Sequence, residues 1–134
     1  MSVEPSVLDK IPLFAGLSRR DCDRVAAVAD EIRADVGATI CRDGDFAYYF
    51  YALVHGGVDV MDGADTLARL GPGDFFGEIG LLVTGRRTAS VVVREPTRLV
   101  AIFDQPFRTL EAEIPEFSKE VRAAMGERGW TPGH

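Results

Sequence analysis

Cysteine and histidine are scarce in this sequence, which holds two of each: Cys22, Cys41, His55 and His134. Two cysteines are too few for a disulfide framework or a zinc site, so we expect reduced thiols, Cys22 on a helix and Cys41 at a strand. Two distant histidines cannot supply the clustered imidazoles of a β-barrel metalloenzyme, and no Ser/His/Asp or Cys/His arrangement is evident. The sequence therefore predicts no metal, no cofactor and no enzyme.

Long apolar runs and an excess of basic residues are also missing. No apolar run approaches the ~20 residues that span a bilayer, and the N-terminus has no basic flank before an apolar stretch, so a secretory signal is not expected. Lys and Arg together number 15 against 21 Asp and Glu, for a net charge of -6. This balance disfavours binding to nucleic acid or to an anionic membrane, although a local basic spot can still bind one phosphate. We expect a cytoplasmic protein.

The patterning predicts a helical segment, then a β-core, then further helices, in one domain over residues 1–134. Apolar spacing and Ser18, a candidate N-cap with Asp21 three residues on, favour helix over about 7–32. Short β-branched and aromatic runs between frequent glycines predict a β-sandwich or barrel over about 34–103. Helices follow over about 104–128, with Asp104 as a cap and Pro115 as an interruption. Residues 129–134 are expected to form a loose tail.

One stretch, FGEIGLLVTGRRTASV at residues 76–91, combines features that suit a ligand. We expect a short helix from Glu78 that ends at Gly85, and the first N–H groups of a helix favour an anion. A nearby arginine can bind two oxygens of a phosphate at once. A carboxylate at Glu78 would repel that phosphate, so its presence favours a role as acceptor for a neighbouring hydroxyl such as a ribose 2′-OH. A salt bridge between Glu78 and the arginine, with no ligand, is the alternative.

These residues resemble the phosphate-binding cassette of cyclic nucleotide-binding domains, which occur in protein kinase A regulatory subunits, cyclic-nucleotide-gated channels and bacterial catabolite activators. Residues 44–60, 67–78 and 107–121 resemble other parts of the same family, so the resemblance covers roughly residues 8 to 128. It implies a mainly β, jelly-roll barrel with an N-terminal helical segment, a short cassette helix and C-terminal hinge and lid helices.

The resemblance also implies which residues would contact the nucleotide. Glu78 would bind the ribose 2′-OH, Gly80 would present a backbone N–H near the phosphate, and Arg87, nine positions after Glu78, would bind the phosphate. Arg86 lies outside the motif and is expected to be solvated. Trp130 is either a lid over the base or a tail residue outside the site. The full set of expected contacts is Phe76, Gly77, Glu78, Ile79, Gly80, Arg87, Thr88 and Ala89.

The function implied is that of a regulatory sensor domain that binds a cyclic nucleotide, with cAMP favoured over cGMP, in a bacterial protein. Movement of the C-terminal helices would carry the signal to an unidentified effector, either a partner protein or a fused domain, and a homodimer through those helices is one option. Only about thirty residues follow the last expected strand, which leaves no room for a DNA-reading module. The alternative is a jelly-roll module that binds no nucleotide and only docks to a partner.

Overall fold

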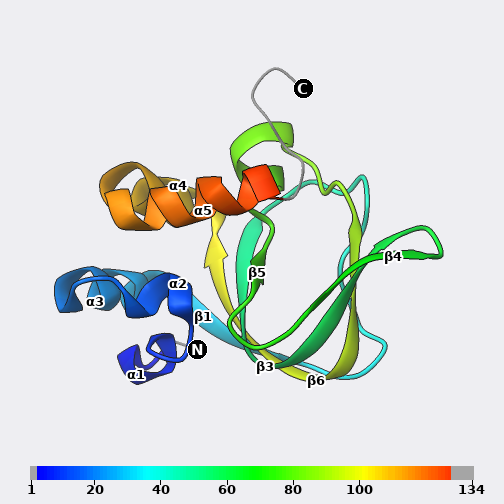
Figure 1. Cartoon of the computed structure of the whole chain (residues 1–134), viewed down its shortest axis with the longest axis horizontal. Coiled ribbons are helices and arrows are strands. Elements are labelled where there is room, and N and C mark those ends of the chain that lie inside the picture. Colours follow the sequence, from blue (N-terminus) through cyan, green and yellow to red (C-terminus); the bar gives the residue numbers. More distant parts are fainter. Residues whose placement is uncertain (1–2, 128–134) are drawn as a thin grey trace.

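The β-core is one six-stranded antiparallel sheet that curls into a barrel, and the helices gather at one side of it (Figure 1). The computed structural model describes residues 3–127. Its elements run in the order α1 (Pro5–Leu8), α2 (Pro12–Ala15), α3 (Arg19–Val28), β1 (Ala29–Ala34), β2 (Thr39–Cys41), β3 (Tyr49–Asp62), β4 (Asp65–Leu70), β5 (Phe75–Phe76), η1 (Gly80–Thr84), β6 (Ser90–Phe103), α4 (Asp104–Glu113) and α5 (Pro115–Glu127). The expected mainly β architecture with helices at both ends is confirmed.

Two long strands, β3 and β6, organise the sheet. The order is β1-β6-β3-β4, while β2 also pairs with β6 and β5 also pairs with β3. Residues 50–54 of β3 are all buried, so this strand is covered on both faces, as its nearly continuous apolar sequence predicts. Strands β3 and β4 are joined by a tight turn after Asp62: Asp62 pairs with Asp65, which leaves Gly63 and Ala64 as a two-residue hairpin loop.

The N-terminal helices differ from the prediction in where they end. Ser18 is the N-cap of α3 and accepts a hydrogen bond from the Asp21 N–H at 3.1 Å, as expected. The helix ends at Val28, however, and residues 29–32 belong to strand β1 rather than to the predicted helix. Strand β1 pairs with β6, and the Arg98 Nε donates to Glu31 Oε1 at 2.7 Å. Pairing with a distant strand thus overrides the local helical pattern.

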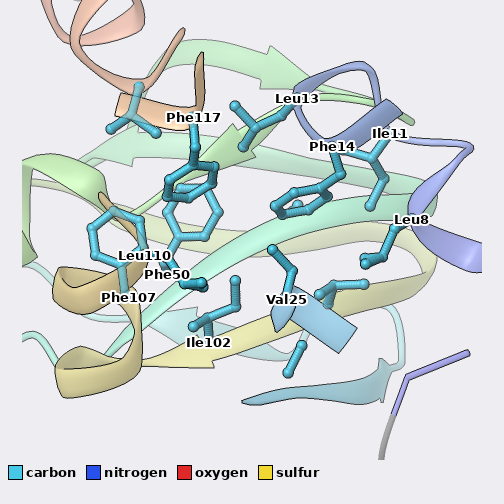
Figure 2. Packing of buried hydrophobic residues seen from close by; sticks show 14 of the residues in the cluster. Leu8, Ile11, Leu13, Phe14, Val25, Phe50, Ile102, Phe107, Leu110 and Phe117 are labelled. Carbon is cyan, nitrogen blue, oxygen red and sulfur yellow. The ribbon is translucent and has the colours of Figure 1, made fainter. Parts of the chain in front are cut away.

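A cluster of buried hydrophobic residues lies between the barrel and the helices (Figure 2). The Phe14 and Phe117 rings stack at 5.9 Å, and Phe50 stacks on Phe107 at 4.7 Å. Phe117 also meets Phe107 edge-on at 5.7 Å. Because these four rings come from α2, β3, α4 and α5, the aromatic cluster ties the terminal helices to the centre of the sheet.

The C-terminal helices break where Pro115 predicts. Helix α4 ends at Glu113 and α5 begins at Pro115. Glu111 accepts hydrogen bonds from Ser118 Oγ at 2.7 Å and Arg122 Nε at 2.8 Å, which fixes the angle between the two helices. Asp104 is not the N-cap, since Phe103 holds that position; Asp104 is instead in the first turn and forms an ion pair with Arg108. No helix within residues 3–127 has the length and apolarity needed to cross a bilayer.

Candidate functional site

All eight residues expected to contact a ligand line one pocket of about 370 Å³. They come from the end of β5, from the helical segment that follows it, and from the loop before β6. Strand β5 pairs with β3 through Tyr51–Phe76, which fixes the start of this segment on the barrel. The structure therefore brings the expected residues together, while their contacts with a ligand stay a prediction.

Arg87 is a buried cation on the wall of this pocket, with 8% of its surface exposed. Its Nη2 donates to the carbonyl oxygen of Tyr49 at 2.6 Å, and its Nη1 donates to the carbonyl oxygen of Gly77 at 3.4 Å. The guanidinium carbon lies 5.7 Å from the centre of the Tyr51 ring. Both carbonyl acceptors are neutral, so these bonds orient the guanidinium without neutralising its charge.

Glu78 is a second charged residue of the pocket wall and is fully buried, at 0% exposure. Gly77, just before it, has φ of 99°, a conformation that strongly favours glycine. A Cβ at Gly77 would lie 2.8 Å from Arg87 Nη1 and 2.9 Å from the Tyr49 carbonyl oxygen. The turn at Gly77 therefore lets the backbone approach Arg87 closely while it directs the next residue into the interior.

The cassette helix forms where predicted, but its hydrogen bonds follow the π-helical pattern rather than that of an α-helix. Helical conformation begins at Glu78, and residues Gly80–Thr84 form the π-helix η1. The Gly85 N–H bonds to the Gly80 carbonyl oxygen at 2.8 Å, and Gly85 ends the helix with φ of 73°, as its position predicts. Single π-helical turns are rare in proteins, and those that occur are often found at functional sites.

The residues after the helix have distinct positions. Arg86 is exposed, lies outside the pocket lining, donates to the Gly44 carbonyl oxygen at 2.9 Å and covers the Phe46 ring at 4.2 Å. It is solvated as predicted and also makes a cation–π contact. Thr88 is exposed and Ala89 is half-buried, and both line the pocket. Trp130 lies outside the described residues.

The far wall of the pocket was not predicted. It consists mainly of apolar side chains from β2, β3, β4 and β6, namely Cys41, Val60, Leu67, Ala68, Leu70 and Val91. Leu67 is 60% exposed, and no signal in the local sequence marks it as part of a site. Glu127, at the end of α5, completes the lining; in Figure 1 this end of α5 (red) reaches the barrel beside η1.

Burial favours the neutral forms of two titratable side chains at or near the pocket, Tyr51 and Cys41. Burial, followed by the neighbouring Cys41, raises the pKa of Tyr51 to about 12, so its phenol keeps its proton. Burial also raises the pKa of the Cys41 thiol, against the opposing effect of Arg87. Both cysteines are free thiols, as expected. Within residues 3–127, no three His, Cys, Asp or Glu side chains are grouped so that they would hold a metal ion.

Comparison with known proteins gives consistent matches. The family model for the cyclic nucleotide-binding domain matches residues 31–113. The cyclic AMP receptor protein of Thermus thermophilus is 33% identical over 122 residues, which cover 87% of this chain and 56% of that protein. The cAMP-dependent protein kinase regulatory subunit of Colletotrichum orbiculare is 30% identical over 117 residues, 86% of this chain and 30% of that protein. The chain thus spans between about a third and about half of the length of these relatives.

A solved structure supports the fold independently. The crystal structure of a putative cyclic nucleotide-binding protein from Geobacter metallireducens superimposes with a TM-score of 0.82 at 23% identity, covering 96% of this chain and 99% of that one. At this identity the likeness concerns the fold alone. The predicted jelly-roll fold with terminal helices is thereby confirmed.

Proposed function

This chain belongs to the cyclic nucleotide-binding domain family, and we propose that its pocket binds a cyclic nucleotide, with cAMP favoured over cGMP. One observation carries the proposal: a buried cation, Arg87, and a buried carboxylate, Glu78, line the same pocket as an apolar wall. A cyclic nucleotide has the matching parts, namely one anionic phosphate, one ribose hydroxyl and a flat base. The volume of about 370 Å³ falls in the usual range of small-molecule sites.

The cyclic phosphate would bind Arg87. A buried guanidinium loses hydration, and two neutral carbonyl partners restore only part of it. A phosphate with two oxygens toward the remaining N–H groups would restore the rest and supply the opposite charge. Thr88, with a hydroxyl at the same wall, would add a donor to the phosphate.

The sugar would bind Glu78, because a carboxylate oxygen accepts hydrogen bonds and the ribose 2′-OH can donate one. The base would pack on the apolar wall formed by Val60, Leu67 and Leu70. Glu127, at the end of α5, would accept a hydrogen bond from an amino group of the base. The preference for cAMP is supported by the relatives described above, which are named for cAMP.

The signal would pass from the cassette to the C-terminal helices. Arg108, on α4, donates from Nη2 to the carbonyl oxygen of Leu81 in η1, and Leu81 is buried in the core that holds Phe107. A nucleotide that binds one position of η1 better than another would therefore bias the position of α4 and α5. An effector, fused or separate, would read that change. The bacterial source, the cytoplasmic location and a homodimer through these helices stay predictions.

The test is a calorimetric titration of the purified protein, shown to be free of co-purified nucleotide, with cAMP and with cGMP. Wild type should bind, with the smaller Kd for cAMP. Arg87→Ala removes two charge-assisted hydrogen bonds, at ~1.5–3 kcal/mol each, and should weaken binding by about 100-fold or more. Arg69→Ala is the matched control: it removes an arginine that is 71% exposed from β4, whose neighbouring residues line the pocket.

Two further measurements separate binding from folding. Arg87→Lys keeps the charge but not the two-pronged geometry, so it should recover only part of the affinity. The melting temperature of each variant shows whether the protein is folded. Absence of heat with both nucleotides, in folded wild-type protein, would favour the alternative of a protein-interaction module without nucleotide.

A further inference from the structure

A second pocket of about 360 Å³ shares two lining residues, Cys41 and Arg87, with the first. Four of its ten lining residues are aromatic: Phe46, Tyr48, Tyr49 and Tyr51. The Tyr49 carbonyl oxygen accepts from Arg87, and the Tyr51 ring lies beneath the guanidinium. We call this the aromatic pocket. None of the roles assigned to the nucleotide pocket uses its aromatic residues.

Two aromatic side chains that line the aromatic pocket, and Phe103 beside it, are exposed to solvent. Phe46 is 58% exposed and Tyr48 is 56% exposed, with their ring centres 6.5 Å apart. Phe103, which is 46% exposed, meets Tyr49 edge-on at 5.3 Å. Single exposed apolar residues are ordinary, but three aromatic rings grouped around a hollow indicate an interaction site.

The charges beside these rings favour an acidic partner. Arg86 covers the Phe46 ring at 4.2 Å, and Arg42 lines the aromatic pocket. With the buried Arg87 they make three cations against two exposed carboxylates, Asp43 and Asp45, of which Asp45 also lines the aromatic pocket, on a chain whose net charge is -6. This surface is therefore locally more positive than the molecule as a whole. Arginine and aromatic residues together are also the composition that marks the centres of protein interfaces.

We propose that the aromatic pocket and its rim form a docking site for a partner protein that inserts an aromatic side chain flanked by acidic residues. The inserted ring would stack on Phe46 and Tyr48, and its acidic neighbours would pair with Arg42 and Arg86. A small molecule would fill the hollow but leave the rim exposed, which is why a protein segment fits better. The surface also adjoins the hinge: the Asp104 N–H, which opens α4, donates to the Tyr48 carbonyl oxygen at 2.8 Å.

The probe is a capped peptide of sequence Glu-Glu-Phe-Glu-Glu, added to isotopically labelled protein without nucleotide and followed by NMR. Shifts should concentrate on amides of residues 39–51 and on Phe103, with Kd on the order of 1 mM, since one anchor residue supplies only a few kcal/mol. The same peptide with Ala in place of Phe, and one with Lys in place of each Glu, should each bind at least about 5-fold more weakly.

Variants locate the binding on the protein. Phe46→Ser and Tyr48→Ser should each raise the Kd of the peptide at least about 5-fold, while Val36→Ser should not, since it removes an equally exposed apolar residue at 62% exposure outside the patch. The proposal is overturned if the two peptide controls bind as well as the acidic aromatic one, or if shifts occur elsewhere. It is also overturned if analytical ultracentrifugation shows that the wild-type protein is a dimer and that Phe46→Ser is a monomer, because the occupant is then a second copy of this chain.

Discussion

Gly77→Ala tests how the nucleotide pocket is built, because one added methyl group meets two constraints at once. The φ of 99° at Gly77 is unfavourable for alanine. The new Cβ would also lie 2.8 Å from Arg87 Nη1 and 2.9 Å from the carbonyl oxygen of Tyr49. That oxygen accepts the 2.6 Å hydrogen bond from Arg87 Nη2, so the methyl group must displace the guanidinium or its acceptor.

The two costs can be separated with neighbouring glycines. Backbone strain costs ~1–2 kcal/mol, and overpacking costs ~1–3 kcal/mol, so Gly77→Ala should lose roughly 2–5 kcal/mol of stability. Gly85→Ala carries strain alone, because φ there is 73° and no atom lies within 4 Å of the added Cβ. Gly80→Ala carries a clash alone, with the Cβ 2.9 Å from that of Ala47.

Thermal unfolding followed by circular dichroism measures these costs, and calorimetric titration with cAMP measures their effect on the site. For a chain of this length 1 kcal/mol corresponds to roughly 3–5 °C in Tm, so Gly77→Ala should melt roughly 6–25 °C below wild type. It should also weaken cAMP binding more than Gly85→Ala does, since only Gly77→Ala moves Arg87. Equal Tm and equal Kd for Gly77→Ala and Gly85→Ala would refute this account of how Arg87 is held.

Three further predictions follow from burial. The pKa of Tyr51 is about 12 in the folded state and 10.0 for an ordinary tyrosine, so the unfolded chain loses this proton first as the pH rises. The free energy of unfolding should therefore fall between pH 10 and 12. Tyr51→Phe should lessen that fall by up to about 3 kcal/mol in alkaline denaturation curves. Phe117→Ala, which empties a fully buried site among three rings, should cost ~3–5 kcal/mol in urea unfolding. Bound cAMP should slow alkylation of Cys41, which lines the pocket, but not of Cys22, as peptide mass spectrometry would show.

The near wall of the pocket was predictable because its residues are contiguous in the sequence. Between Gly77 and Ala89 the chain makes one turn, one short helix and one loop, and glycine, carboxylate and arginine at fixed spacing indicate all three. The type of helix was not predictable. Gly77 and Gly85 mark its ends, but the Gly85-to-Gly80 bond of a π-helix and the bond of an α-helix differ by one residue, which the spacing does not distinguish.

The far wall and the end of α3 depend on pairing between distant segments. Leu67 and Leu70 reach the pocket only because β4 folds back on β3, and on their own they look like ordinary residues of an exposed strand. Residues 29–32 look helical locally, yet Ala29 pairs with Ile102 across the sheet, and that contact decides the conformation. Glu127 reaches the pocket only because Pro115 and the aromatic cluster set the direction of α5.

Arg87 makes the two pockets physically dependent on each other. It lines both, and its hydrogen bond to Tyr49 joins the guanidinium to the backbone of the aromatic pocket. A partner that shifts Tyr49 would therefore move the Arg87 cation and change the affinity of the nucleotide pocket for its ligand. By reciprocity, a bound nucleotide would change the affinity of the aromatic pocket for the partner by the same factor. This coupling runs through the Arg87–Tyr49 hydrogen bond and requires no movement of α5, whereas coupling through a lid requires α5 to move.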